Sequence, residues 1–248
     1  MRAEDFDLLF SLEENFWWFV GMRRITDTIV ARELGLPNLT ILDAGCGTGF
    51  NLGYYSAGER RDIYGLDVSM DALKWVRKRT VRNVAQGSVT DIPFKSEVFD
   101  VVFSFDVLQQ LSSVLSEQAI REMHRVLKPG GHLFVRAAAF EWLRSSHDEE
   151  LHTVHRFTRN EMRAKLGRTG FEVERSDYAN GFLFPVALVR RFLKRFGIAG
   201  GTDVRPLPHS VAWLDSIFCR ILFAEAWWFK RERRLPFGLS VMCYARKK

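Results

Sequence analysis

Apolar runs and amphipathic segments alternate through the middle of the chain. Strand-like apolar runs lie near residues 40–43, 62–67, 81–86, 99–104, 132–138 and 171–178. Segments with helical periodicity lie between them, near 49–57, 69–79, 115–127 and 158–169. Such alternation predicts a mostly parallel sheet that helices cover on both faces.

The pattern changes at both ends of the chain. Residues 5–34 are expected to be helical and contain the cluster Phe16-Trp17-Trp18-Phe19. From 180 to 236 the alternation stops and two amphipathic helices are expected, and 239–245 then alternates like a strand. We therefore expect a helical lid over 1–39, a cofactor-binding core over 40–179, an inserted helical substrate cap over 180–236 and a last core strand over 237–248.

Three glycines follow the first predicted strand at alternate positions: Gly45, Gly47 and Gly49. Glycine accepts a positive φ and lets the main chain approach a ligand without a Cβ in the way. A strand, a glycine-rich turn and a helix form the nucleotide sites of open α/β sheets. Phe50 breaks the Gly-x-Gly-x-x-Gly dinucleotide spacing, and a purely structural turn remains the alternative for the glycines alone.

A second acid, Asp67, ends the next predicted strand. An acid at this place accepts hydrogen bonds from the hydroxyl groups of a ribose. The alternative is a helix N-cap, but Ser69 is the better cap, and we expect Asp67 to be left free for a ligand.

These motifs resemble the class I S-adenosylmethionine-dependent methyltransferases, including their type 11/12-like members. The segment 43–49 is similar to their first motif, and Asp67 stands where their ribose-binding acid stands. Three further segments match in order, at 86–94, 99–111 and 124–131, where Lys128-Pro129-Gly130-Gly131 is expected to form a turn. The resemblance implies a Rossmann-like, seven-stranded, mostly parallel sheet with an antiparallel last strand, and S-adenosyl-L-methionine as the cofactor.

The resemblance also implies which residues contact the cofactor. They are Asp43, Gly45, Gly47, Gly49, Asp67, Val68, Ser88, Val89, Phe105 and Asp106. Ser88 departs from the family pattern, because many relatives carry at this position an acid that reads the adenine amino group.

The lid adds two candidates, Trp18 over the cofactor and Arg23 for the methionine carboxylate, because a guanidinium can donate two parallel bonds. The alternative for the tryptophan pair is core packing. The segment 14–24 also resembles a bacterial methyltransferase subgroup that is often associated with lipid or glycan metabolism.

Three histidines, His147, His152 and His155, occur within nine residues after the fifth strand. They could supply a general base near the acceptor, with His147 the first candidate and His152 the second. They could also belong to a metal site of histidines and carboxylates, or to a polar surface turn. If the segment is helical, Asp148 shares a face with His152, and so does Leu151 with His155.

Positive charge is concentrated near the C-terminus. The formal net charge is +6, and residues 182–248 hold 13 Lys and Arg against 4 Asp and Glu. Four of these bases, at 190, 191, 194 and 195, are expected on one face of an amphipathic helix. This predicts an anionic partner, such as the inner face of a membrane, while a solvated basic surface is the alternative.

The cysteines and the hydropathy pattern bear on localisation. The three cysteines form no Cys-x-x-Cys pair, which argues for a reducing compartment and against a zinc site. We find no signal-peptide pattern and no apolar run long enough to span a membrane, and we expect a cytoplasmic protein.

We expect methyl transfer to oxygen or nitrogen of a small-molecule or lipid-like acceptor. RNA methylation and a catalytically silent binding protein are the alternatives. No Asn-Pro-Pro-Tyr-like motif follows the fourth strand, which argues against nucleic acid, and the intact Asp43 and Asp67 argue against a silent protein.

Overall fold

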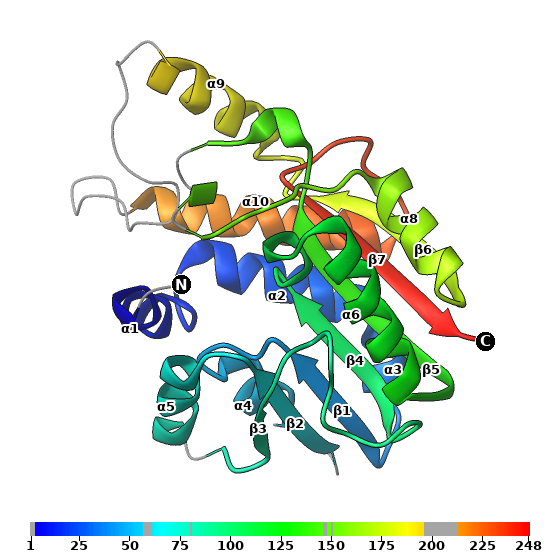
Figure 1. Cartoon of the computed structure of the whole chain (residues 1–248). Helices are drawn as coiled ribbons and strands as arrows, with labels where there is room; N and C mark the ends of the chain where they lie inside the picture. The colour runs from blue at the N-terminus through cyan, green and yellow to red at the C-terminus, as the bar shows by residue number, and fades with distance from the viewer. Residues whose placement is uncertain (1–2, 57–60, 80, 146–147, 150, 196–212) are drawn as a thin grey trace.

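The computed structural model describes residues 3–56, 61–79, 81–145, 148–149, 151–195 and 213–248, with residues 3–5 and 190–195 described by their backbone alone (Figure 1). Seven strands form one sheet in the order β3-β2-β1-β4-β5-β7-β6. They are β1 Leu39–Ala44, β2 Arg61–Asp67, β3 Val84–Gln86, β4 Phe99–Phe105, β5 Leu127–Ala138, β6 Phe171–Ala179 and β7 Ser240–Lys247.

The last strand lies inside the sheet rather than at its edge. Strand β7 pairs antiparallel with both β5 and β6, whereas the pairs among β1 to β5 are parallel. This confirms the predicted Rossmann-like fold, with its antiparallel last strand beside the sixth.

Helices cover both faces of the sheet. Within the described residues they are α1 Ala3–Leu12, α2 Trp17–Ile29, α3 Ala31–Leu34, α4 Phe50–Ser56, α5 Met70–Lys78, α6 Ser113–Val126, α8 Arg159–Arg168, α9 Phe184–Arg195 and α10 Trp213–Lys230. Two short 3₁₀ turns, η1 Leu108–Gln110 and η2 Glu141–Leu143, follow β4 and β5. Alternate strand residues face opposite sides of the sheet, so Leu42 joins one buried cluster and its neighbour Ile41 the other.

Local chemistry explains where several helices begin. The hydroxyl of Ser69 accepts a hydrogen bond from Ala72 N–H at the start of α5. Thr158 accepts one from Glu161 N–H at the start of α8 in the same way. Each cap satisfies one of the main-chain donors that a helix N-terminus leaves without a partner.

The helical character expected over 5–34 is confirmed, and the structure divides this stretch into α1, α2 and α3. One sequence-based expectation about these elements was wrong. The segment Lys128–Gly131 is not a separate turn, because β5 begins at Leu127 directly after α6. Leu127 is buried and pairs with Phe99, so the chain passes directly from helix to strand. The pairing of β4 with β5 is irregular at this point, with a register shift after Phe99 and a positive φ at Gly130.

The N-terminal helix α2 and the C-terminal helix α10 lie side by side (Figure 1). They approach closely at Gly21, where an added Cβ would lie 2.3 Å from Leu222 Cδ1 and 2.5 Å from Leu222 Cβ. The absence of a side chain at Gly21 therefore sets the distance between these helices.

We expect Gly21→Ala to destabilise the protein by about 1–3 kcal/mol, which is typical of overpacking. The direction of the change in stability distinguishes packing from helix propensity. Propensity alone predicts that Gly21→Ala stabilises the protein, because alanine is the better helix former by about 1 kcal/mol. Urea unfolding checks the effect, and adding Leu222→Ala should make the double variant more stable than the sum of the two single changes. A Gly21→Ala protein more stable than the wild type would contradict the packing described here.

Candidate functional site

A cavity of about 850 Å³ opens at the carboxyl ends of the parallel strands. Its walls come from α1 and α2, the glycine turn after β1, the ends of β2, β4 and β5, and the helices α9 and α10. The sheet order reverses between β1 and β4 at this place, and ligands of open α/β sheets bind at such a switch point.

The three glycines of the turn after β1 all have positive φ, of 94° at Gly45, 53° at Gly47 and 81° at Gly49. A Cβ at Gly45 would lie 2.1 Å from Val107 Cγ2, so the turn packs against the end of β4 only without a side chain. A Cβ at Gly47 would meet just Leu9, at 3.9 Å. Gly47 is therefore where the main chain faces the open cavity.

The carboxylate of Asp67, at the end of β2, accepts hydrogen bonds from two main-chain N–H groups. Gly47 N–H donates to its Oδ2 at 2.8 Å, and Ser69 N–H donates to its Oδ1 at 2.9 Å. The expectation of a free Asp67 was wrong, because the two turns that follow β1 and β2 meet at its carboxylate. Each carboxylate oxygen can accept a second hydrogen bond, so the residue that shapes the turn can also hold ligand hydroxyl groups.

Asp43 lies behind the glycine turn and is 1% exposed. Within the described residues neither of its carboxylate oxygens has a hydrogen-bond partner, although Asn51 is near enough to favour the charged form. Burial, and then the nearby carboxylate of Asp67, raise the pKa of Asp43 to about 7. Asp43 does not line the cavity and supports the turn from behind.

We expect Asp43 to make the stability of the cofactor-free protein depend on pH. A carboxyl group with a raised native pKa contributes stability that is complete below the unfolded pKa and is lost as the pH rises through the native value of about 7. Asp43→Asn should remove this component, on the order of 4 kcal/mol between pH 4 and pH 7. Thermal unfolding of both proteins across this range measures it, and identical pH profiles would contradict it.

The junction of α1 and α2 contributes Glu13, which sequence reasoning missed. Its carboxylate accepts hydrogen bonds from the Thr48 hydroxyl of the glycine turn and from Arg79 Nη2, at 2.7 Å for the latter. Burial raises the pKa of Glu13. These bonds join the N-terminal helices to the glycine turn. In the sequence, the signal for Glu13 was an acidic residue directly after an apolar one, Leu12, in a segment rich in aromatic residues. The structure shows that Leu12 is buried.

The predicted lid residues Arg23 and Trp18 both line the cavity. Arg23 donates to the carbonyl oxygens of Glu13 and Glu14 and stacks on the ring of Phe50, 4.3 Å from its centroid. These bonds use two of its five N–H donors, so the guanidinium can still meet a carboxylate. The role of each residue toward the cofactor stays a prediction.

A partly buried ion pair lines the cavity. Arg136 on β5 pairs with Asp106 at the end of β4, between the rings of Trp18 and Phe105, whose centroids lie 4.9 and 5.1 Å from the guanidinium carbon. Asp106 and Phe105 were candidate cofactor residues, and both line the cavity. Arg136 was missed, although a single arginine inside the apolar run of β5 was a visible signal.

The remaining cofactor candidates lie on the loops after β2 and β3. Val68, Ser88 and Val89 all line the cavity. The Ser88 hydroxyl hydrogen-bonds the Thr90 hydroxyl at 2.7 Å. Val89 is buried and offers an apolar surface to a flat ring.

The described part of the histidine segment does not continue as a helix through His155, so the shared faces considered for a helical segment do not form. His152 is exposed and has a φ of 53° in a turn, and residues 153–156 belong to no helix or strand, so Leu151 and His155 share no helix face. His152 does not line the cavity, although Leu151 and Thr153 do. His155 bonds Glu161 at 2.8 Å.

His147 lies outside the described residues, and the roles of His147 and His152 as bases stay predictions. Among the residues that the structure describes, no group of three or more histidine, cysteine and acidic side chains could hold a metal ion.

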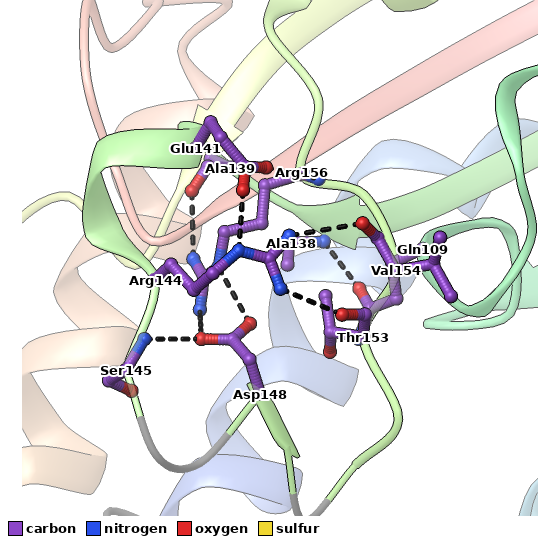
Figure 2. A network of polar contacts seen from close by, with 10 residues as sticks. All are labelled: Gln109, Ala138, Ala139, Glu141, Arg144, Ser145, Asp148, Thr153, Val154 and Arg156. Carbon is purple, nitrogen blue, oxygen red and sulfur yellow. Dashed lines mark hydrogen bonds and ion pairs between the residues drawn. The ribbon is translucent and has the colours of Figure 1, made fainter.

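Two arginines fix the chain after β5 (Figure 2). Arg156 donates Nε to Asp148 Oδ1 at 2.7 Å, Nη2 to Asp148 Oδ2 at 3.1 Å and Nη1 to the Ala139 carbonyl at 2.8 Å. Arg144 donates to the carbonyls of Thr153 and Val154. Burial acts to raise the pKa of Asp148, but its bonds from Arg156 and Ser145 outweigh burial and lower it. This network gives one wall of the cavity a fixed shape.

The groups around the glycine turn fit S-adenosylmethionine. Asp67 has room for acceptor bonds to ribose hydroxyls, Gly47 leaves room for close main-chain approach, and Arg23 has N–H donors left for a carboxylate. Val89 and Phe105 line the cavity with apolar surface on which an adenine ring can pack.

Comparison with known proteins agrees with this geometry. Residues 42–135 match the family described as "Methyltransferase domain". A malonyl-[acyl-carrier protein] O-methyltransferase of Geobacter sulfurreducens is 31% identical over 222 residues, which cover 82% of this chain and 79% of the relative. The chain belongs to the class I S-adenosylmethionine-dependent methyltransferases. This confirms the family, and with it the cofactor, that the motifs predicted.

Two other comparisons are consistent with the methyltransferase assignment. A "Probable S-adenosylmethionine-dependent methyltransferase" of Mycolicibacterium smegmatis is 30% identical over 168 residues, 65% of this chain and 62% of the relative. This match therefore spans less than two thirds of that relative's length. A chain from the Haloferax volcanii complex of the Trm112 methyltransferase activator has the same fold, with a TM-score of 0.61, 19% identity and coverage of 97% of this chain and 96% of that chain.

In methyltransferases of this class the protein's contribution is to position groups and exclude water. The cofactor supplies the methyl group and its leaving group for an in-line displacement. Asp67, the glycine turn, Trp18 and Arg23 all line the cavity, and their roles toward the cofactor stay predictions. A general base is required only where the acceptor must lose a proton.

Proposed function

We propose that this methyltransferase acts on oxygen or nitrogen of an apolar small-molecule or lipid-like acceptor. The observation that carries the proposal is that the lining of one cavity combines polar groups at the glycine turn with mainly apolar side chains from α2, α9 and α10, which we call its two halves. The half at the glycine turn is polar and suits the cofactor. The other half extends between α2, α9 and α10 and is mainly apolar.

The apolar half is built by the N-terminal and C-terminal helices together. Trp17 of α2 packs on Phe218 of α10 with their ring centroids 5.1 Å apart, and both line the cavity. Leu183, Val186 and Leu214 extend the same lining. Removing apolar surface from water stabilises a complex by roughly 25 cal/mol per Å², so this half favours an acceptor with a substantial hydrocarbon part.

A few polar groups in the apolar half can orient the acceptor. Asn180 is 1% exposed and lines the cavity, and its Oδ1 has no hydrogen-bond partner among the described residues. An acceptor O–H or N–H that donates to this oxygen would satisfy a buried group whose isolation costs about 1–3 kcal/mol. The Arg136–Asp106 pair also lines the cavity and offers further polar groups to the reacting end of the acceptor.

The names of relatives support oxygen as the acceptor atom. The Geobacter relative and a second one, from Enterobacter lignolyticus, are both called malonyl-[acyl-carrier protein] O-methyltransferase. The second is 32% identical over 112 residues, 43% of its length.

Incubation with S-adenosylmethionine labelled in its methyl group tests the proposal. Organic-soluble, aqueous small-molecule and RNA fractions are each offered as acceptors. We expect label in the organic-soluble fraction, and we expect Phe218→Asp to abolish it while cofactor binding persists. Label confined to RNA would favour an RNA methyltransferase, and tight cofactor binding without any labelled product would favour a silent binding protein.

A further inference from the structure

Helix α10 has two faces with different surroundings. Leu214 and Phe218 line the cavity, and Leu222, Ala226 and Phe229 are buried against the rest of the molecule. The opposite face is exposed along the 18 residues of the helix. One helix therefore separates the cavity from the outside.

The exposed face of α10 combines large apolar side chains with bases. Trp213 is 61% exposed, Trp227 52%, Phe223 43% and Ile217 39%. Trp213, Ile217 and Trp227 stand at i, i+4 and i+14, which is the spacing of one helix face. We call this surface, with the bases described next, the outer face of α10.

The bases on and just after this face are Arg220, Lys230, Arg231, Arg233 and Arg234, all exposed. Arg231 stacks on Trp227 with its guanidinium carbon 4.0 Å from the ring centroid. The acids of α10 are Asp215, outside this face, and Glu225, which is fully buried. Glu232 is the single acid among the bases that follow the helix.

We propose that the outer face of α10 docks the protein onto an anionic lipid bilayer. Helices that lie in the interface present tryptophan and aliphatic side chains to the acyl boundary and bases to the headgroups. Bases near an anionic leaflet add to the binding, and tryptophan is enriched at the level of the headgroups. The outer face of α10 has both kinds of side chain, with five bases and Glu232 as the one acid among them.

The charge pattern favours a bilayer over a second copy of the chain. A twofold interface would place the outer face of α10 on itself, which would bring the bases of one copy near the bases of the other. Like charges brought together in this way are unfavourable.

The side chains of residues 190–195 lie outside the described ones, so the four bases expected on α9 add nothing to this argument. Among the described residues no helix is long and apolar enough to cross a membrane, so the contact proposed is peripheral.

The docking surface and the cavity share α10. An apolar acceptor that leaves the bilayer would meet a helix whose outer face touches lipid and whose inner face, at Leu214 and Phe218, lines the apolar half of the cavity. The docking proposal stands on the outer face alone and does not require that the acceptor be a lipid.

Vesicle co-sedimentation of the full chain tests the proposal. The vesicles contain either phosphatidylcholine alone or equal parts of phosphatidylcholine and phosphatidylglycerol. We expect binding to the anionic vesicles at low salt, and weakening as salt is added. The triple variant Arg220→Gln, Lys230→Gln and Arg231→Gln should bind at least about 30-fold more weakly. Trp213→Ala with Trp227→Ala should also reduce binding.

A matched control removes three exposed bases from the other end of the sheet, by Lys74→Gln, Arg77→Gln and Lys95→Gln. Its vesicle binding should stay within about threefold of the wild type. Circular dichroism and cofactor affinity should be unchanged in all variants, because none of the altered residues lines the cavity.

Two results would overturn the proposal. The first is no binding to anionic vesicles at low salt, and the second is equal loss of vesicle binding in the control and the triple variant. If vesicles do not bind, two further assays show which other partner the outer face serves. Single-stranded RNA binding lost in the triple variant would then assign the face to RNA, and a dimer lost in the tryptophan variant would assign it to a second copy.

Discussion

Asp67→Ala should weaken binding of S-adenosylmethionine and of S-adenosylhomocysteine by about 30-fold or more. Hydrogen bonds to a charged group contribute roughly 1.5–3 kcal/mol each, and every 1.4 kcal/mol is about tenfold in affinity. The change would remove the acceptor for the ribose hydroxyls. It would also release the N–H groups of Gly47 and Ser69 and so loosen the turn that approaches the ligand.

Isothermal titration calorimetry measures this effect, with wild-type affinity expected in the micromolar range. Asp62→Ala is the matched control, because Asp62 is an exposed acid on the same strand, away from the cavity, and its loss should leave affinity unchanged. Asp67→Asn keeps one acceptor oxygen and should lie between the wild type and Asp67→Ala. Equal affinities of the wild type and Asp67→Ala would contradict the assignment of Asp67 to the ribose hydroxyls.

Glu225→Leu should lower the free energy of unfolding by about 3 kcal/mol or more, because each buried donor left without a partner costs about 1–3 kcal/mol. Glu225 is fully buried on α10 and accepts hydrogen bonds from the N–H groups of Asn180, Gly181 and Phe182. These bonds attach α10 to the end of β6. They also hold Asn180 at its positive φ of 59°.

The effect of Glu225→Leu should depend on pH. Burial raises the pKa of Glu225 to about 7. The contribution of a group with a raised native pKa is complete below its unfolded pKa and is lost as the pH rises through 7, so the loss of stability should be larger at pH 5 than at pH 8.

Urea unfolding at the two pH values measures it. Ser216→Leu, on the exposed face of the same helix, is the control and should change stability by at most about 0.5 kcal/mol. A Glu225→Leu protein as stable as the wild type at pH 5 would show that these hydrogen bonds do not hold α10 in place.

The parts that the sequence predicted well depend on local requirements. The glycines after β1 adopt positive φ or close approach, which their spacing and the preceding strand already implied. The strand and helix alternation likewise follows from the period of the apolar residues, and Ser69 caps its helix as its sequence position suggested.

The parts that the sequence did not predict depend on partners far along the chain. Glu13 forms an ion pair with Arg79, and Arg136 forms one with Asp106. No local sequence pattern predicts which residues pair across such distances along the chain. Asp67 was expected to be free because the approach of Gly47 N–H, 20 residues earlier, could not be seen from the sequence. The sequence could not decide between a helix and a surface turn for the histidine segment, because periodicity does not reveal the left-handed φ of His152.

The division of the cavity into two halves is a tertiary property as well. Helices α2 and α10 are at opposite ends of the chain, and their packing brings Trp17 to Phe218. The sequence showed that both helices are rich in aromatic residues. It did not show that the two helices pack on each other and line one cavity.

A crystal structure of the full chain with S-adenosylhomocysteine tests the central claim most directly. We predict that the ligand lies in the cavity at the carboxyl ends of the parallel strands, with its ribose hydroxyls on Asp67, its main-chain contact at Gly47 and its sulfur facing the apolar half between α2 and α10. A ligand bound elsewhere on the molecule, or bound in the cavity with its ribose away from Asp67, would contradict the account.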